Sequence, residues 1–158
     1  MARRSAGLLL YRRVEGELQV LLVHPGGPFW ANRDAGAWSI PKGEYEPDEA
    51  PDRAALREFQ EETGIAVAGK LSPLGDAVQP SRKIVTAYAL ESDIDIAAIN
   101  SNTFEIEWPP RSGRRLAFPE IDRAGWFNIP EAALKILPGQ AVFLARLSEH
   151  IARTEHGG

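Results

Sequence analysis

The sequence predicts a single α/β domain, and three observations support this class. Short apolar runs with β-like composition recur along the chain, and segments with helical periodicity lie between them. Of the 158 residues, 44% are hydrophobic and 25% are charged, which is typical of one folded domain. A chain of this length buries roughly 70% of the surface that its unfolded form exposes, so it needs no disulfide or structural metal to fold.

The N-terminal part is expected to form a β-hairpin followed by a loop. Residues 5–11 and 17–24 are apolar runs with β-like composition, and Glu15-Gly16 between them suits a tight turn. Residues 25–36 are dense in glycine and proline, which indicates a loop. Residues 37–40 are then expected to form a short strand that ends at the proline following them.

A helix is predicted from Pro51 to Thr63. Pro51 suits the first helical position, Asp52 favours the positive end of the helix dipole, and Gly64 suits the left-handed residue that ends a helix. A helical wheel gathers four side chains into the stripe that should pack on a sheet. They are Ala55, Leu56, Phe59 and Thr63.

Strand-like stretches continue after this helix. They lie at residues 67–78, 83–91, 103–108 and 124–129. Residues 109–120 are rich in proline, glycine and arginine and are expected to form a long connection. Trp108, Trp126 and Phe127 are expected to lie in the core, because large aromatic side chains at the ends of strands are usually buried.

The C-terminal part is expected to be helical. Pro130 suits the start of a short helix that runs to Leu137. A last helix, about residues 140–153, places one apolar stripe at fourfold spacing. The stripe consists of Phe143, Leu147 and Ile151. One domain is therefore expected over residues 1–153, with a flexible tail at 154–158.

Charge and composition exclude several classes of function. The 18 basic and 22 acidic residues give a net charge of −4, which disfavours binding of nucleic acid through its phosphate backbone. The absence of cysteine excludes disulfides, thiolate nucleophiles and zinc–thiolate sites. His24, His150 and His156 are too scattered for a histidine-rich metal site, and His24 is expected to be a structural residue with satisfied hydrogen bonds.

No membrane partner is expected from the sequence. No apolar run approaches the roughly 20 residues that a helix needs to cross a bilayer. The run Gly7–Tyr11 is too short for the core of a signal peptide. The expectation is a cytoplasmic protein that is a monomer or a homodimer.

Three glutamates share one face of the helix predicted at 51–63. With Glu58 at zero, Glu61 lies at about −60° and Glu62 at about +40° on the wheel. Like charges at positions i and i+4 cost an isolated helix about 0.2–0.5 kcal/mol, and a bound cation would remove this cost. Hard carboxylate oxygens suit Mg²⁺ or Mn²⁺, and Mg²⁺ commonly takes phosphate oxygens as further ligands. The face therefore indicates phosphate chemistry.

Arg57 precedes this acidic face by one residue. It lies four residues before Glu61, where its guanidinium can pair with a carboxylate and fix the rotamer. Glu49, just before the helix, is its other expected partner. An exposed acidic helix with an arginine pair is the alternative interpretation of the same pattern.

A longer motif decides against that alternative. Residues 43–65 have the sequence GEYEPDEAPDRAALREFQEETGI, which fits G-x5-E-x7-R-E-U-x-E-E-x-G-U at every specified position, with U apolar. The segment resembles the Nudix box. The resemblance implies a Nudix fold, in which a central mixed β-sheet lies between α-helices. It also implies an enzyme that uses Mg²⁺ or Mn²⁺ to hydrolyse a nucleoside diphosphate linked to another moiety.

The resemblance also implies roles for residues of the box. Glu61 and Glu62 correspond to the principal metal ligands of the family, and Glu58 corresponds to a further ligand or a general base. A backbone carbonyl near Gly43 or Lys42 would complete the site. The pairing of Arg57 with Glu49 is implied to be structural, as is the glycine Gly64 that ends the helix.

In many relatives a further carboxylate comes from outside the box. Glu120, just before the strand that ends in Trp126-Phe127, is the best-placed candidate here. The alternatives are Glu105, Glu107 and Asp122. The implied step is attack of a metal-activated water on phosphorus while a carboxylate accepts the proton.

Several other residues are candidates for substrate binding. Lys42 beside the box and Arg82-Lys83 at the start of a strand could bind phosphates, or they could be solvated. Arg114, with Arg111 and Arg115, could form a phosphate clamp or lid, or a mobile solvated loop. Trp30 could stack on a base or cap the core.

Substrate identity stays open at this stage. Residues 38–43 resemble members that act on dinucleoside polyphosphates, and Pro80 has a spacing similar to that of ADP-ribose-cleaving members. Nucleoside triphosphates and capped RNA ends are further alternatives, although the negative charge favours a small nucleotide over RNA. A non-catalytic nucleotide sensor is the second class of function, and the complete carboxylate set favours the enzyme.

Overall fold

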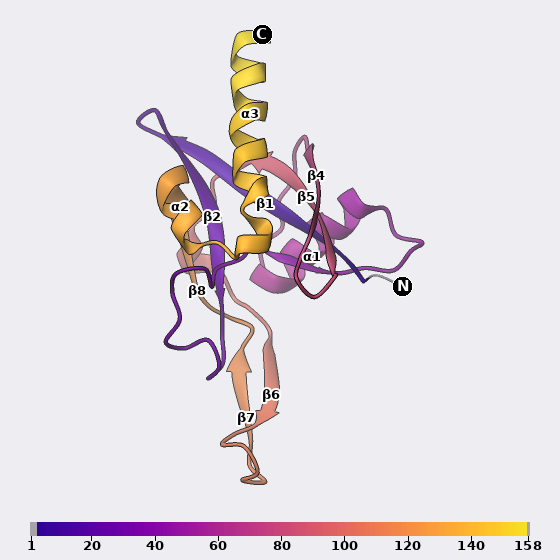
Figure 1. Cartoon of the computed structure of the whole chain (residues 1–158), viewed down its shortest axis with the longest axis vertical. Coiled ribbons are helices and arrows are strands. Elements are labelled where there is room, and N and C mark those ends of the chain that lie inside the picture. Colours follow the sequence, from indigo (N-terminus) through magenta and orange to yellow (C-terminus); the bar gives the residue numbers. More distant parts are fainter. Residues whose placement is uncertain (1–2, 158) are drawn as a thin grey trace.

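The computed structural model describes residues 3–157 and shows a six-stranded mixed sheet between helices (Figure 1). Its strands are β1 (Arg4–Val14), β2 (Glu17–Pro25), β3 (Lys42–Glu44), β4 (Ser72–Val78), β5 (Ile84–Glu91) and β8 (Ile121–Asn128). The order is β4-β5-β1-β2-β8, and β3 pairs with β1. Only β1 and β5 run parallel among the pairs of this sheet in the described chain. The mixed sheet implied by the Nudix resemblance is confirmed.

Helices cover both faces of the sheet. Their bounds are Pro51–Thr63 for α1, Ile129–Lys135 for α2 and Val142–Gly157 for α3, with short 3-10 turns at Ile96–Ala98 and Pro138–Gln140. Residues of β1 alternate between the two sides: Leu9 packs with the residues of α2 and α3, whereas Leu8 and Leu10 pack with those of α1. The sheet is therefore buried on both faces.

The predicted apolar stripes of the helices are confirmed. In α1, Ala55, Phe59 and Thr63 are fully buried, as is Ala54, while Leu56 is half-buried. In α3, Phe143, Leu147 and Ile151 are buried against the other face of the sheet. Because α1 uses one side for packing, its carboxylate side is left beside β3.

The predicted hairpin of β1 and β2 is also confirmed, and Glu15 and Gly16 occupy its turn with φ values of 52° and 82°. The short strand predicted at 37–40 is wrong, because residues 38 and 39 form only isolated bridges. The paired strand begins after the proline, at Lys42–Glu44, where it can bond to the edge of β1.

A second sheet projects away from the body of the molecule (Figure 1). It is the hairpin of β6 (Thr103–Glu107) and β7 (Arg115–Pro119). The prediction of a long connection over 109–120 is therefore wrong in its second half. Cross-strand pairs such as Phe104 with Phe118 define β7, and such pairs cannot be recognised from a proline- and arginine-rich segment alone.

Trp108 is not in either core, which corrects its predicted burial. It lies at the outer end of β6, where its ring packs edge-on against the exposed ring of Phe29 with centroids 5.5 Å apart. Trp126 and Phe127 are half-buried and pack against the two cores, as expected.

The C-terminal helix is longer than predicted. It continues to Gly157, so residues 154–157, expected to belong to a flexible tail, extend α3; residue 158 lies outside the described residues. No helix among residues 3–157 combines the length and the hydropathy that a bilayer span needs.

Candidate active site

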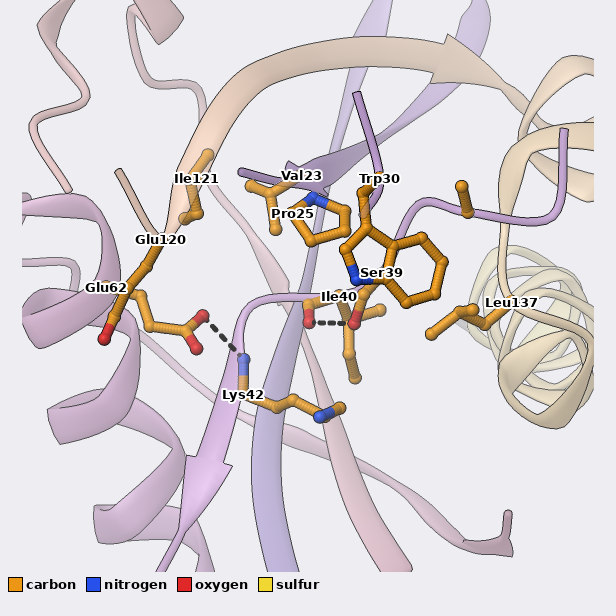
Figure 2. Close-up of a pocket in the computed structure, with 11 residues that line it drawn as sticks. Val23, Pro25, Trp30, Ser39, Ile40, Lys42, Glu62, Glu120, Ile121 and Leu137 are labelled. Atoms are coloured by element: carbon orange, nitrogen blue, oxygen red, sulfur yellow. Dashed lines mark hydrogen bonds between the residues drawn. The ribbon is translucent and has the colours of Figure 1, made fainter. Parts of the chain in front are cut away.

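The end of α1 is tied to β3 by a carboxylate. Glu62 Oε2 accepts a hydrogen bond of 2.9 Å from the backbone N–H of Lys42 (Figure 2). Burial raises the pKa of Glu62 to about 8, although the bond from Lys42 and the charge of its ammonium oppose this shift. A carboxylate that is costly to ionise therefore lies at the edge of β3.

The next residue of β3 has no side chain, which leaves room for a carboxylate of α1. A Cβ at Gly43 would lie 1.9 Å from Glu58 Oε2, far inside van der Waals contact. The side chain of Glu58 is only 13% exposed, and its burial raises its pKa against the opposing effect of Arg57. Gly43 therefore allows a second carboxylate of α1 to lie directly on the backbone of β3.

Arg57 connects three carboxylates. Its Nε and Nη2 donate to Glu49 at 2.7 and 2.8 Å, which is a bidentate pair. Its Nη1 donates to Glu58 at 2.9 Å and to both oxygens of Glu61 at 3.1 Å. The hydrogen bonds from Arg57 lower the pKa of Glu49, and those to Glu49 raise the pKa of Arg57. Both predicted partners of Arg57 are confirmed.

The chemistry of these residues fits a hard divalent cation. The donors are carboxylate and carbonyl oxygens, and burial raises the pKa of two of the three helix carboxylates. In this structure Glu58 and Glu61 face Arg57 while Glu62 faces Lys42. Accordingly, no group of three or more metal-ligating side chains is already gathered within residues 3–157.

A cavity of about 210 Å³ opens beside Glu62. Figure 2 shows Glu62 and Glu120 on one side of it, Lys42 below and Trp30 opposite. The other lining residues are Val23, Pro25, Ala37, Ser39, Ile40, Ile121 and Leu137. The charge of Glu120 contributes to the raised pKa of Glu62, and burial lowers the pKa of Lys42. The cavity thus has a charged side and an apolar side.

The structure places the four carboxylates outside residues 43–65 that are candidates for the general base in different surroundings. Glu120 lines the cavity. Asp122 is hydrogen-bonded to His24, and Glu105 and Glu107 are exposed on β6. Among these four, only Glu120 lies with Glu62 on the cavity wall. His24 is fully buried with both ring nitrogens in hydrogen bonds, which confirms its predicted structural state.

Three predicted substrate-binding residues lie outside this cavity. Arg82 and Lys83 lie at the β4–β5 turn, where Lys83 Nζ is 3.8 Å from Glu44 Oε1. Arg114 is exposed at the outer end of the projecting hairpin, where its carbonyl accepts from the backbone N–H of Trp108. Of the predicted set, Lys42 and Trp30 line the cavity.

Apart from Trp30, the residues of the apolar wall were not anticipated by sequence reasoning. The residues of this wall come from β2, from the loop before β3, from the start of β8 and from the segment after α2. Apolar residues in strands and loops carry no signal that distinguishes a cavity wall from the core, so only the fold brings them together.

The sequence motif and this arrangement agree with a domain-wide match: the family model for the NUDIX domain matches residues 1–147. The chain belongs to the Nudix family. Its fold is also that of solved relatives. The crystal structure of a C. elegans Ap4A hydrolase binary complex superposes with a TM-score of 0.65 at 22% identity, covering 96% of this chain and 98% of that one.

Curated relatives of this Nudix chain are named for different activities. A Myxococcus xanthus octanoyltransferase is 34% identical over 68% of this chain and 27% of its own length. A Caenorhabditis elegans bis(5'-nucleosyl)-tetraphosphatase (asymmetrical) is 35% identical over 41% of this chain and 43% of its own length. A mouse diphosphoinositol polyphosphate phosphohydrolase 3-alpha is 42% identical over 46% of this chain and 38% of its own length. The matched segments thus span less than half of each of these relatives.

Proposed function

We propose that this Nudix protein is a hydrolase, dependent on Mg²⁺ or Mn²⁺, that cleaves a pyrophosphate bond in a nucleoside diphosphate-linked substrate. The single observation that carries the proposal is the cavity in which Glu62 and Glu120 face an apolar wall with Trp30. Carboxylates suit metal and proton transfer, and the wall suits a nucleobase, so one cavity offers both requirements.

The roles of the residues follow from their positions. Glu58, Glu61 and Glu62, with the carbonyl of Gly43, would hold the cation. The cation supplies charge neutralisation of the diphosphate and acidification of a water ligand. Arg57 and Glu49 hold the carboxylates in place through the bonds described above. Their role is therefore to position the ligands.

Glu120 is proposed as the residue that accepts the proton during hydrolysis. Water attacks phosphorus, a new P–O bond forms, and the bridging P–O bond breaks with its electron pair on the leaving phosphate. The proton of the attacking water passes to the Glu120 carboxylate. Lys42, whose ammonium borders the cavity, would bind a phosphate oxygen, because a bound anion offsets the burial that lowers its pKa.

Dinucleoside polyphosphates are the substrates that we favour. A relative named as a bis(5'-nucleosyl)-tetraphosphatase matches in sequence, and an Ap4A hydrolase matches in fold across nearly the whole chain. The ring of Trp30 is half-buried at the wall of the cavity, where a nucleobase would stack on it. We place this activity in the cytoplasm, on one domain that includes the whole of α3.

A substrate panel in H₂¹⁸O tests this function. The panel holds diadenosine tetraphosphate, ADP-ribose, nucleoside triphosphates, a diphosphoinositol polyphosphate and capped RNA, each with Mg²⁺ or Mn²⁺, and products are identified by mass. We expect fastest turnover of diadenosine tetraphosphate and ¹⁸O in one product, which identifies the attacked phosphorus. Tight binding with no turnover of any compound would instead indicate a sensor module.

A further inference from the structure

His24 is a fully buried polar side chain in β2 for which the proposed reaction has no use. Its Nδ1 lies 2.7 Å from Asp122 Oδ1, and its Nε2 lies 2.6 Å from the carbonyl oxygen of Arg33. A carbonyl can only accept, so Nε2 carries a hydrogen, and Nδ1 shares a proton with the carboxylate. The ring also packs edge-on against Trp38 at 5.2 Å. One side chain thus bridges two separate segments.

The first segment is the loop at residues 26–37, which carries Trp30. Arg33 donates its backbone N–H to the Trp30 carbonyl at 3.0 Å, and its guanidinium lies 5.6 Å from the Trp30 ring. The bond from His24 to the Arg33 carbonyl therefore acts three residues from the aromatic wall of the cavity. Moving the backbone of this turn away from β2 would therefore break that bond.

The second segment is the start of β8. Asp122 follows Glu120 and Ile121, which both line the cavity. The Glu120 carbonyl in turn accepts from the backbone N–H of Gly26 at 3.0 Å, at the beginning of the same loop. The side of the cavity that carries Glu120 and the side that carries Trp30 are thus joined through the buried ring of His24.

We propose that His24 is a positioning residue that sets the separation between Trp30 and Glu120 and so controls how tightly the base is bound. This inference rests on the proposed function. Other bonds hold the loop further on: Trp38 Nε1 and Lys135 Nζ both donate to Asp34. Those bonds tie Asp34, the residue after Arg33, to Trp38 and to α2, whereas His24 ties Arg33 itself to β2 and through Asp122 to β8.

Four variants of the full-length protein test the inference. His24→Phe keeps a ring beside Trp38 but loses both hydrogen bonds. Asp122→Ala removes only the β8 bond, and Asp122→Asn restores a hydrogen-bond partner for Nδ1, because the side-chain N–H of asparagine can donate to the neutral ring. His150→Phe, on α3 and outside this cavity, is the matched control. The assays are kcat and KM for diadenosine tetraphosphate, thermal unfolding, and hydrogen exchange of residues 27–36.

We expect KM to rise about tenfold in His24→Phe with kcat within about threefold of wild type, because a tenfold weaker affinity corresponds to about 1.4 kcal/mol, which is the size of one lost buried hydrogen bond. Asp122→Ala shifts KM in the same direction, Asp122→Asn restores it, and His150→Phe changes neither constant. Hydrogen exchange of the loop accelerates in His24→Phe and Asp122→Ala, and it stays at the wild-type rate in Asp122→Asn and His150→Phe. If His24→Phe does not fold, KM and loop exchange in Asp122→Ala and Asp122→Asn test the inference in its place.

Two outcomes overturn the inference. Lower melting temperatures with unchanged KM and unchanged exchange of the loop would show that His24 serves stability alone. A KM that stays high in Asp122→Asn would show that the hydrogen bond is not what positions the wall. If the wild-type protein neither cleaves nor binds a nucleotide, the proposed function fails, whereas loop exchange still reports whether the bridge exists.

Discussion

The segment at residues 43–64 and the hairpin of β6 and β7 differ in how their side chains are held. In the first, Glu62 bonds to Lys42, Glu58 lies on Gly43, and Arg57 joins three carboxylates. In the second, Phe29 packs on Trp108, the turn is exposed, and no strand of the main sheet pairs with it. Side chains held by several neighbours can keep the geometry that chemistry needs, and this difference predicts where substitutions will matter.

The largest effect is expected from removing a carboxylate of α1. Glu61→Gln and Glu62→Gln should each lower kcat on the order of 10²–10³-fold, because an amide is a much poorer ligand for a divalent ion and carries no charge. Circular dichroism should show an intact fold in both. The measurement is initial rate at saturating Mg²⁺.

Gln60 provides the control for these two variants. It is exposed on the same helix, so Gln60→Ala should keep kcat within about twofold of wild type, as surface substitutions usually do. Near-normal turnover of either glutamine variant would contradict the assignment of metal ligands.

A smaller loss is expected from adding one methyl group to β3. Gly43→Ala places its Cβ where Glu58 Oε2 lies, so the carboxylate must move by an ångström or more, and kcat should fall by about ten- to a hundredfold. A double-mutant cycle checks the cause. In a Glu58→Ala background the clash is absent, so Gly43→Ala should add less than about twofold. A full additional loss would show that Gly43 acts otherwise.

The raised pKa of Glu62 predicts that Glu62→Gln, which lowers kcat, raises the stability of the fold at alkaline pH. The pKa of Glu62 is about 8 in the folded chain and 4.5 ordinarily, so the folded state binds the proton more tightly. Stability is therefore lost as pH rises from 4.5 through 8. Glu62→Gln cannot ionise and escapes this loss.

Thermal unfolding in EDTA measures this effect. Glu62→Gln should melt at least about 2–4 °C above wild type at pH 9, which corresponds to about 1 kcal/mol. The difference should shrink at pH 5, where Glu62 is protonated in the folded wild type. An equal difference at both pH values would disprove the explanation from burial.

The smallest effect is expected in the hairpin. A strand advances about 3.3 Å per residue, so Arg114 lies about 20 Å from Glu120 along β7. Replacing Arg111, Arg114 and Arg115 together by alanine should therefore change kcat/KM by less than about twofold at 0.15 M salt. A loss of tenfold or more would mean that the hairpin folds over the cavity, as the lid hypothesis from the sequence suggests.

The same contrast explains what could be predicted from the sequence. The segment at 43–64 is local, because its helix signals, its motif and the pairing of Arg57 with Glu49 all lie within about 20 residues of one another. Its helix and the pairing of Arg57 with Glu49 were predictable in detail. The positions of several main strands along the chain were also recoverable, since their apolar runs are long and the turn at Glu15-Gly16 is distinctive.

What could not be predicted depends on distant partners. β7 exists through pairing with β6, and the strand at Lys42–Glu44 exists through pairing with β1. The cavity joins segments as far apart as Val23 and Leu137. No local pattern in a single sequence encodes contacts between such distant segments. The sequence favours Glu120 only by its place before a predicted strand, and the fold is what separates it from Glu105, Glu107 and Asp122.

The turn between β6 and β7 has a practical consequence for anyone who wishes to manipulate this protein. Residues 111–113 are exposed, Arg111 and Gly113 already adopt positive φ values, and the hairpin points away from the main body (Figure 1). An affinity peptide or a fluorophore attached there would lie away from the cavity beside Glu62. Such a handle would allow immobilisation on a sensor chip with both chain ends left native.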